Sequence, residues 1–290
     1  MNRRRFLAGS AALLGAGLAG TGAYAWLGEP FWIEVVERPL PVEALPDALI
    51  GARLIQISDI HVGPYVDGDY LLRALRMVAE LEPDLLVITG DLITWRAPEH
   101  MEALRRLLAS LPRAPLGTVA VLGNHDYGRG WRNGAIADGV TAALEEVGVT
   151  VLRNATSSVA GITFAGVDDL WSPNFRLDET LATPLAPPSI VLCHNPDGAD
   201  RPGWGDFRGW ILAGHTHGGQ VRAPFRTSPF LPVRNERYDE GEFALAGGRR
   251  MYINRGLGYH LQLRLLVRPE ITVFTLGDDP RAGQPTAAAQ

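Results

Sequence analysis

The chain contains no lysine, and all 27 of its basic residues are arginines. Without a lysine amine, the protein can form neither a Schiff base with a carbonyl substrate nor the lysine contact of a P-loop. Cys193 is the only cysteine, which excludes a disulfide within the chain and any zinc cluster built from cysteines. The net charge of −5 gives no electrostatic basis for coating nucleic acid, so we expect no nucleic-acid partner.

The N-terminus has the pattern of an export signal. Arg3, Arg4 and Arg5 precede an uncharged run that ends at Gly28 and is rich in alanine, leucine and glycine. Two arginines, a spacer and then Phe-Leu resemble a twin-arginine signal, which predicts the twin-arginine translocase as a partner during export. The stretch Ala23-Tyr24-Ala25 offers a small-x-small cleavage site. An ordinary amphipathic or buried helix is the alternative, and the glycine-rich run fits it poorly.

If the signal is retained, residues 6–28 are just long enough to anchor the chain in a bilayer. The arginines before this run place the body of the protein outside the cytoplasm in either case, in the periplasm or cell envelope. We therefore divide the chain into four segments: a signal peptide or membrane anchor (1–25), an extended lead-in (26–50), one catalytic domain (51–277) and a disordered polar tail (278–290).

The body alternates short apolar runs with helical patterns. Strands are predicted at Arg53–Ile57, Leu85–Ile88, Thr118–Leu122, Ile190–Leu192, Trp210–Ala213, Met251–Asn254 and Glu270–Leu276. Helices are predicted at Asp69–Leu81, Pro98–Leu111 and Ala135–Val147. Strands that alternate with helices indicate an α/β fold, at least in the first half of the chain.

Polar side chains follow five of the predicted strands. The five segments are Ser58-Asp59-Ile60-His61, Thr89-Gly90-Asp91, Gly123-Asn124-His125-Asp126, Cys193-His194-Asn195 and Gly214-His215-Thr216-His217. Because the carboxyl ends of strands in an open α/β sheet border one crevice, these segments are expected to meet there. Five of the seven histidines of the chain lie in them, and we interpret the other two, His100 and His260, as structural.

Each segment alone has an ordinary structural explanation. Asp91 suits a helix cap, Asn124 suits a turn, and His194 suits a buried histidine bonded to backbone. Their coincidence at five strand ends favours a metal site instead. Two carboxylates, four imidazoles and one amide exceed the needs of one ion and suit two ions bridged by a carboxylate. Mixed oxygen and nitrogen ligands favour manganese, iron or zinc.

In this order, the five segments resemble the motifs of the calcineurin-like metallophosphoesterases, over residues 53–276. The resemblance implies a four-layer α-β-β-α sandwich of two mixed sheets, with a dimetal site at the strand ends. It implies Asp91 as the bridging ligand, with Asp59, His61 and His217 at one metal and Asn124, His194 and His215 at the other. It also implies that His125 assists the leaving group and that Asp126 orients His125.

The chain departs from the family at Thr94, where many members have an acid or amide. Thr94 is not an expected metal ligand, so the departure affects the residues around the ligands and not the ligands themselves. Gly218-Gly219-Gln220-Val221 and the segment Asn254-Arg255-Gly256-Leu257-Gly258 resemble the bacterial membrane-associated phosphodiesterase branch. That branch includes a pyrophosphatase that acts on UDP-2,3-diacylglucosamine.

The sequence therefore predicts a hydrolase that uses two divalent ions and water to cleave phosphodiester or pyrophosphate bonds. A noncatalytic metal-binding envelope protein and a metal-dependent amidohydrolase are the alternatives, and His125, as a nonligand histidine, argues against the first. Residues 223–243 mix aromatic side chains with arginines, which suits either a lipid substrate with an anionic head group or ordinary core packing.

Overall fold

A computed structural model describes residues 3–222, 228 and 230–279 of the chain. Its first sheet has six strands in the order β1 (Glu34–Val42), β12 (Glu270–Asp278), β2 (Arg53–Ile57), β3 (Leu85–Thr89), β4 (Gly117–Val121) and β5 (Thr150–Val151). Strands β2 to β5 are parallel, whereas β12 runs antiparallel to β2. The carboxyl ends of β2, β3 and β4 therefore lie at one edge of this sheet.

The second sheet also has six strands, and it is likewise mixed. Their order is β10 (Gly241–Ala244), β11 (Arg250–Ile253), β9 (Trp210–Ala213), β8 (Ser189–Leu192), β7 (Ile162–Gly166) and β6 (Ala155–Val159). The four central strands are parallel to one another, and the two outer strands pair antiparallel. The carboxyl ends of β8 and β9 supply the remaining predicted site residues.

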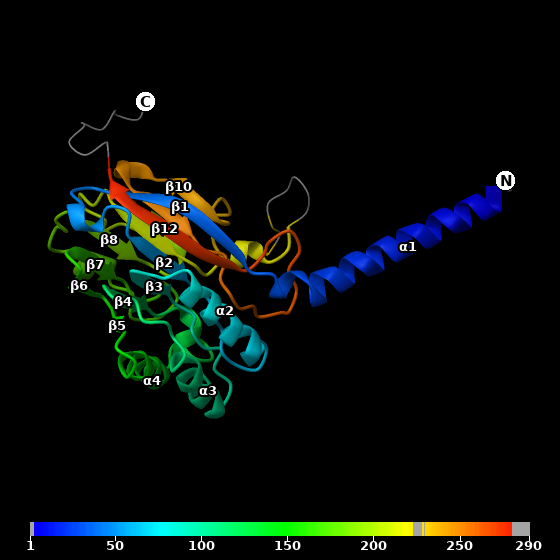
Figure 1. The fold of residues 1–290 in the computed structure, drawn as a ribbon, viewed down its shortest axis with the longest axis horizontal. Helices are drawn as coiled ribbons and strands as arrows, with labels where there is room; N and C mark the ends of the chain where they lie inside the picture. The colour runs from blue at the N-terminus through cyan, green and yellow to red at the C-terminus, as the bar shows by residue number, and fades with distance from the viewer. Residues whose placement is uncertain (1–2, 223–227, 229, 280–290) are drawn as a thin grey trace.

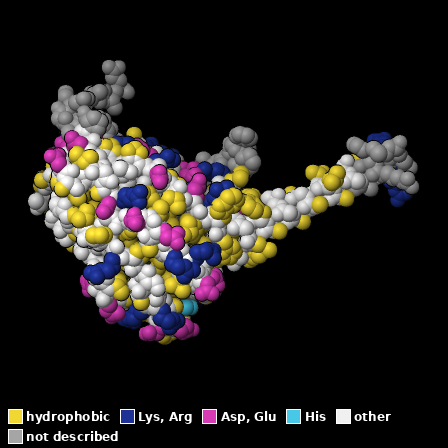
Figure 2. Space-filling view, viewed as in Figure 1, with side chains coloured by type: hydrophobic (Ala, Val, Ile, Leu, Met, Phe, Trp, Pro, Cys, Tyr) yellow, Lys and Arg dark blue, Asp and Glu magenta, His cyan; other side chains and the backbone are white. Residues whose placement is uncertain are grey.

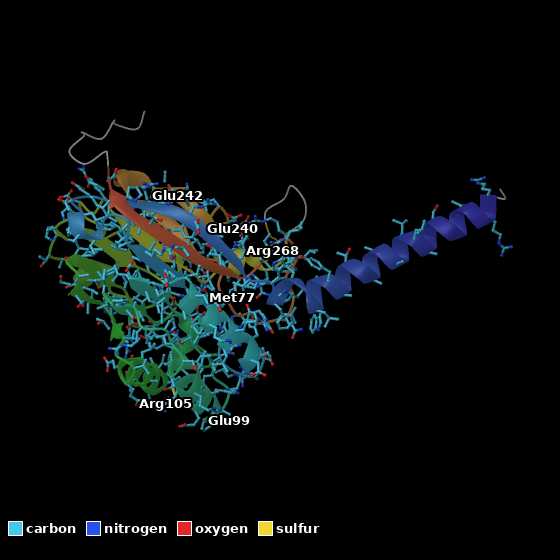
Figure 3. All side chains as sticks on the ribbon, in the orientation of Figure 1. Met77, Glu99, Arg105, Glu240, Glu242 and Arg268 are labelled. Carbon is cyan, nitrogen blue, oxygen red and sulfur yellow. The ribbon has the colours of Figure 1, made fainter. Side chains whose placement is uncertain are left out.

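Helices α2 (Gly68–Glu80), α3 (Glu99–Leu108) and α4 (Gly134–Glu145) cover the outer face of the first sheet (Figure 1). Their apolar residues recur at helical spacing and pack on the sheet, as Leu71, Leu75 and Val78 of α2 do. In Figure 3, the labelled side chains Glu99 and Arg105 mark the α3 side of the molecule, and Glu242 marks the opposite side with β10. This helical layer was predicted, and each helix begins within one residue of the expected position.

The two sheets pack face to face through a continuous apolar core that includes Leu54, Val87, Phe164 and Leu212. The outer face of the second sheet is covered by short segments, among them helix α5 (Leu177–Thr180) and the 3₁₀ segment η4 (Pro196–Asp200), and its core includes the buried Cys193. The predicted α/β sandwich of two mixed sheets is therefore confirmed, with a fourth layer made of short helices and loops.

Five further 3₁₀ segments are short, and two of them carry predicted site residues. They are η1 (Glu29–Phe31), η2 (Asp47–Leu49), η3 (Asn124–Tyr127), η5 (His217–Gly219) and η6 (Ala246–Gly248).

The segment predicted as an extended lead-in, residues 26–50, contributes an edge strand to the first sheet. Strand β1 pairs with β12 along its whole length and forms the edge of the first sheet. Pro39 and Pro41 obscured it in the sequence, because proline interrupts a strand that has neighbours on both sides. At an edge, the strand has a free side on which a missing N–H costs little.

Helix α1 (Arg3–Leu27) projects from the body, and hydrophobic side chains gather where it joins (Figures 1 and 2). Its last turns are bonded to a loop of the domain: Ala25 O accepts from Arg264 N at 3.0 Å, and Trp26 O accepts from the Gln262 amide at 2.9 Å. Among the described helices, none combines the length and the hydropathy needed to cross a bilayer. Most of the predicted tail, residues 280–290, lies outside the described residues.

Candidate metal centre

The five loops that follow β2, β3, β4, β8 and β9 meet at one place between the two sheets. All seven predicted ligands lie there, each at most 4% exposed: Asp59, His61, Asp91, Asn124, His194, His215 and His217. Carboxylates and imidazoles buried together at this density cost free energy unless something neutralises or coordinates them. The loops therefore build a site for a ligand.

Asp59, His61 and His217 form the first ligand group, whose donor atoms all lie within 4.8 Å of one another. The Nε2 atoms of the two imidazoles are 3.1 Å apart, and His217 Nε2 is 3.4 Å from Asp59 Oδ1. The two ring nitrogens thus converge on one point beside a carboxylate. This arrangement is typical of a divalent metal site with mixed ligands.

Asp91, His194 and His215 form the second ligand group, whose donor atoms also lie within 4.8 Å of one another. Asp91 Oδ2 is 3.2 Å from His194 Nε2, and His194 Nε2 is 3.3 Å from His215 Nδ1. The same Asp91 oxygen is 3.7 Å from His61 Nε2 of the first group. Asp91 therefore lies between the two groups, where a bridging carboxylate has to be.

The environment of the Asn124 side chain indicates whether these residues fit a metal ion. Its side chain is fully buried, and neither its amide nitrogen nor its amide oxygen has a hydrogen-bond partner among the described residues. An unpaired buried amide costs about 1–3 kcal/mol, so such groups are rare unless a ligand satisfies them. An amide oxygen beside imidazoles and carboxylates suits a divalent cation, and the donor set therefore fits the predicted one.

The backbone at the ligands is strained. Five of the seven have a positive φ between 51° and 72°, a region that side chains other than glycine rarely adopt: Asp59, His61, Asp91, His215 and His217. Such conformations persist only where the surrounding structure holds them, and they gather at functional sites. Gly123 is needed for a different reason, because a Cβ there would collide with the Asp91 carboxylate.

Neighbouring groups fix the orientation of the imidazoles. His61 Nδ1 lies 3.0 Å from the Thr94 hydroxyl, and His194 Nδ1 lies 2.6 Å from the Thr89 carbonyl oxygen. Such contacts at the second ring nitrogen set which nitrogen faces a metal. The departure from the family at Thr94 therefore leaves His61 with an oriented partner, although a hydroxyl replaces the usual acid or amide.

The electrostatics of the pocket favour neutral imidazoles at three of the four histidines. Burial lowers the pKa of His215 to about 3, and burial also holds the pKa of His61 and His217 well below the usual range. At His194, burial is outweighed by Asp91, which raises its pKa well above the usual value. Because metal ligation needs a free lone pair, the three neutral rings suit ligation directly, and a cation would replace the proton of His194.

His125 lies at the rim of the site. Its ring centroid is 5.1 Å from that of His61, and its backbone N–H donates to Asp91 Oδ1 at 2.8 Å. The carboxylate of Asp126 accepts from the backbone N–H groups of Ile93 and Gly123, at 3.1 and 2.8 Å. No hydrogen bond joins Asp126 to the His125 ring within the described part of the chain. Asp126 therefore holds the backbone of the loop, and its role in orienting His125 stays a prediction.

His260 is a site residue that the sequence analysis missed. Its ring centroid lies 4.1 Å from those of both His61 and His125. It sits on a loop well beyond the end of β11, so the rule that polar residues follow strand ends could not find it. His100, in contrast, is structural as expected, since its Nδ1 accepts the N–H groups of Arg96 and Ala97 just before α3.

Asp169 is a second residue that was missed. It lies three residues after β7, and burial raises its pKa to about 7. One carboxylate oxygen accepts the N–H of Trp171 at 2.7 Å, and the other is buried without a partner among the described residues. The pair Asp168-Asp169 after an apolar run was the available signal, because it repeats the pattern of an acid at a strand end.

A cavity of about 360 Å³ opens over the ligands. Asp91, Asn124, His125 and His215 line its floor, and its walls are mostly apolar, with Trp171, Val221, Phe230, Pro232, Leu261 and Leu263. Of the predicted aromatic and basic surface at 223–243, Phe225, Arg226 and Pro229 lie outside the described residues. Arg222 is paired with Asp239 and Glu240, so it is not a free cation for a ligand.

Comparison with known proteins gives consistent matches. The family model of the calcineurin-like phosphoesterases matches residues 52–219. The chain is 37% identical to an uncharacterized metallophosphoesterase, YkuE, of Bacillus subtilis, over 95% of this chain and 98% of that protein. It is 33% identical to the phosphodiesterase YaeI of Escherichia coli, over 95% and 99%. It is 28% identical to the UDP-2,3-diacylglucosamine pyrophosphatase LpxG of Chlamydia muridarum, over 78% and 84%.

Proposed function

Since the chain belongs to the calcineurin-like phosphoesterase family and is a phosphoric ester hydrolase, we propose that it cleaves phosphodiester or pyrophosphate bonds with two divalent ions. The observation that carries the proposal is Asp91, whose carboxylate lies between two three-residue ligand groups. Manganese, iron and zinc suit the mixed nitrogen and oxygen donors. Bound there, two such ions supply Lewis acidity and an activated water.

The residues of the chain divide the remaining tasks. The seven ligands hold the cations, and Asn124 contributes the one neutral oxygen ligand. His125 stands at the cavity floor outside the two ligand groups, where its ring can give a proton to the leaving-group oxygen. His260, in ring contact with His125, limits how that imidazole can turn. The apolar walls exclude water from the phosphate, which strengthens every charge interaction at the floor.

An amphiphilic phosphoester is the substrate class that this cavity suits. Phe230 and Leu261 line it and are 71% and 52% exposed, so apolar surface continues from the cavity to solvent. LpxG is named for a diacylated nucleotide sugar, and YaeI is named as a phosphodiesterase. A pyrophosphatase that acts on a lipid precursor is therefore the second candidate, supported by the apolar walls. A small soluble diester is the alternative that the assay below distinguishes.

Export by the twin-arginine translocase forms part of the proposal. Its support is the arginine-rich start of α1, its glycine-rich continuation and the absence of acidic residues before Glu29. A relative from Danio rerio, 33% identical over 84% of this chain, is named a transmembrane protein with a metallophosphoesterase domain. These observations support our proposal that the enzyme works in the cell envelope.

Metal analysis and a substrate panel test the proposal together. The purified protein is expected to hold two equivalents of manganese, iron or zinc. It is expected to hydrolyse bis-p-nitrophenyl phosphate or a nucleoside diphosphate sugar faster than p-nitrophenyl phosphate. Faster hydrolysis of a diacylated nucleotide sugar than of its unacylated counterpart would support the lipid candidate. A protein that binds two ions and turns over none of these substrates would be the noncatalytic metal-binding protein considered above.

A further inference from the structure

A second cavity, of about 480 Å³, lies beside the metal centre and contains none of its ligands. We call it the arginine cavity, and it is lined by Leu170, Trp171, Asp197, Asp200, Arg201, Arg234 and Asn235. Trp171 also lines the apolar cavity over the metal centre, so this side chain belongs to the walls of both. The two cavities are therefore neighbours across a single tryptophan.

Trp171 and two residues on the segments that carry the other walls of the arginine cavity contact the ring of His215. The rings of His215 and Trp171 are nearly perpendicular, with centroids 4.5 Å apart. His215 Nε2 lies 3.1 Å from the amide nitrogen of Asn195, which caps η4, and 2.9 Å from the carbonyl oxygen of Pro232. Arg201 follows η4, and Arg234 follows Pro232 by two residues. Both arginines are thus carried by segments that are anchored at the metal centre.

The acidic groups of the arginine cavity are already satisfied. The two oxygens of Asp197 accept the backbone N–H groups of Arg234 and Asn235, at 2.7 and 3.0 Å. The oxygens of Asp200 accept from the Asn235 amide and the Tyr238 hydroxyl, both at 2.7 Å. These bonds tie η4 to the 230–235 segment and fix the shape of the cavity. Because of these bonds, the carboxylates of Asp197 and Asp200 already have hydrogen-bond donors within the protein.

The guanidinium groups of Arg201 and Arg234 are not used by the walls of the cavity that the structure describes. Among the described residues, neither has a hydrogen-bond or ion-pair partner. The arginine cavity therefore offers unused donors and few unused acceptors, which suits an acceptor-rich anion. A guanidinium binds phosphate through two parallel N–H groups, and it does so better than any other side chain. Trp171 adds a partly buried aromatic ring that lines both this cavity and the cavity over the metal centre.

We propose that the arginine cavity is a subsite for a second phosphate group of the substrate, distinct from the phosphate that is cleaved. The inference rests on the proposed function, since it assumes that the scissile phosphate lies over the metal ligands. A substrate would then span both cavities past Trp171, with the second phosphate between Arg201 and Arg234. The shared chemistry is a phosphate monoester, which either a nucleotide or a lipid head group can supply.

Kinetics with two esters test the subsite. Thymidine 5′-(p-nitrophenyl phosphate) and its 3′-phosphorylated counterpart differ only in the second phosphate. The wild-type enzyme is expected to show a KM roughly tenfold lower for the 3′-phosphorylated ester, as one charge-assisted contact of about 1.4 kcal/mol would give. The double variant R201Q/R234Q is expected to lose this preference and keep its kcat for the unphosphorylated ester. The same preference in the double variant would overturn the proposal.

R237Q is the matched control. Arg237 lies on the same loop, but its guanidinium stacks on Tyr238 and donates to Ala244 O, and it does not line the arginine cavity. Its substitution removes one positive charge from the same region and is expected to leave the preference for the 3′-phosphorylated ester unchanged. A loss in R237Q equal to that in the double variant would mean that the effect is long-range charge, which also overturns the subsite.

Calorimetric titration separates the subsite from the hydrolase assignment. Chelator-treated protein is titrated with thymidine 3′,5′-bisphosphate and with glycerol 3-phosphate, neither of which is turned over. Tighter binding of the first supports a nucleotide source, and tighter binding of the second supports a lipid head group, provided that R201Q/R234Q weakens it about tenfold. Binding that the double variant leaves unchanged overturns the subsite. If no ester is cleaved although metals are bound, the proposed function fails while these titrations still decide the subsite.

Discussion

Asp91 is the residue whose substitution distinguishes a dimetal centre from a single site. An amide in its place keeps the size of the side chain but loses the charge that two cations share. D91N is therefore expected to lose at least one metal equivalent and to lower kcat by a factor of about 10³ or more, which metal analysis and a diester assay measure.

Asp126→Asn is the matched control, because Asp126 is an equally buried carboxylate in the same group of loops. Its oxygens accept backbone N–H groups only, so the variant leaves one donor unpaired. It is expected to reduce the free energy of unfolding by about 1–3 kcal/mol and to keep both metals. Equal, mild losses in the two variants would contradict a bridge at Asp91.

Substitution of His125 distinguishes a catalytic role from a role in metal binding. H125A is expected to keep the wild-type metal content and to lower kcat by about 10²–10⁴, as loss of a general acid does. The loss should be smaller for p-nitrophenyl esters, whose leaving group needs little protonation. H215A is expected to lose a metal and all turnover with every substrate. Metal loss in H125A would make His125 a ligand and refute its proposed role.

At the scale of elements, the strand-end rule predicted most of the site. All seven ligands follow strands that are buried on both faces and show no alternation of buried and exposed residues, namely β2, β3, β4, β8 and β9. Their residues are mostly apolar, and the exception in β2 is the buried Gln56. Most of the strands that were missed are short, polar or rich in proline, whereas β7 was missed although it is mostly apolar and buried. Strand β6 is a polar example, since Ala155–Val159 is mostly exposed and holds two serines and a threonine.

The loop that carries His260 was beyond prediction for a physical reason. It has no regular structure of its own and is held in place by distant residues. Arg264, fully buried, donates to the carbonyl oxygens of Arg255 and Gly258, at 3.0 and 2.8 Å, and lies 3.5 Å from His217 Nδ1. The buried Glu29 accepts the N–H of Val267 at 2.6 Å. Contacts over more than two hundred residues leave no local pattern in a sequence.

Arg264→Met tests this loop as an element. The variant leaves buried carbonyl oxygens unpaired, each at a cost of about 1–3 kcal/mol, and removes the neighbour of a metal ligand. It is expected to lower both the Tm and the metal affinity. Arg249→Met is the control, because Arg249 donates to Ala199 O and stacks on Trp204 beneath the second sheet. It should lower the Tm alone. Unchanged metal affinity in Arg264→Met would confine Arg264 to a structural role.

At the scale of the whole molecule, the arginines at the start of α1 are expected to decide where the enzyme works. Changing Arg3, Arg4 and Arg5 to glutamine should leave a folded, metal-loaded protein in the cytoplasm, which fractionation and metal analysis of each fraction measure. The triple lysine variant is the control, because it keeps the charge. Retention of the lysine variant in the cytoplasm would show that recognition depends on arginine and not on charge alone. Normal export of the glutamine variant would contradict the prediction of a twin-arginine signal.

The labelling rate of Cys193 can report whether the metal centre is occupied. It is the only thiol, it is 1% exposed, and it directly precedes the ligand His194, while burial raises its pKa above that of an ordinary thiol. A thiol reagent can therefore modify it only when the end of β8 opens. Because metals bind the closed site, we expect labelling to be slower by at least tenfold with metal than after chelation, as mass spectrometry over time would show. Equal rates would mean that the metals leave this strand unprotected. The labelling rate then reports occupancy of the metal centre without any substrate. It therefore distinguishes a metal-loaded protein that shows no activity from a protein that has no metal bound.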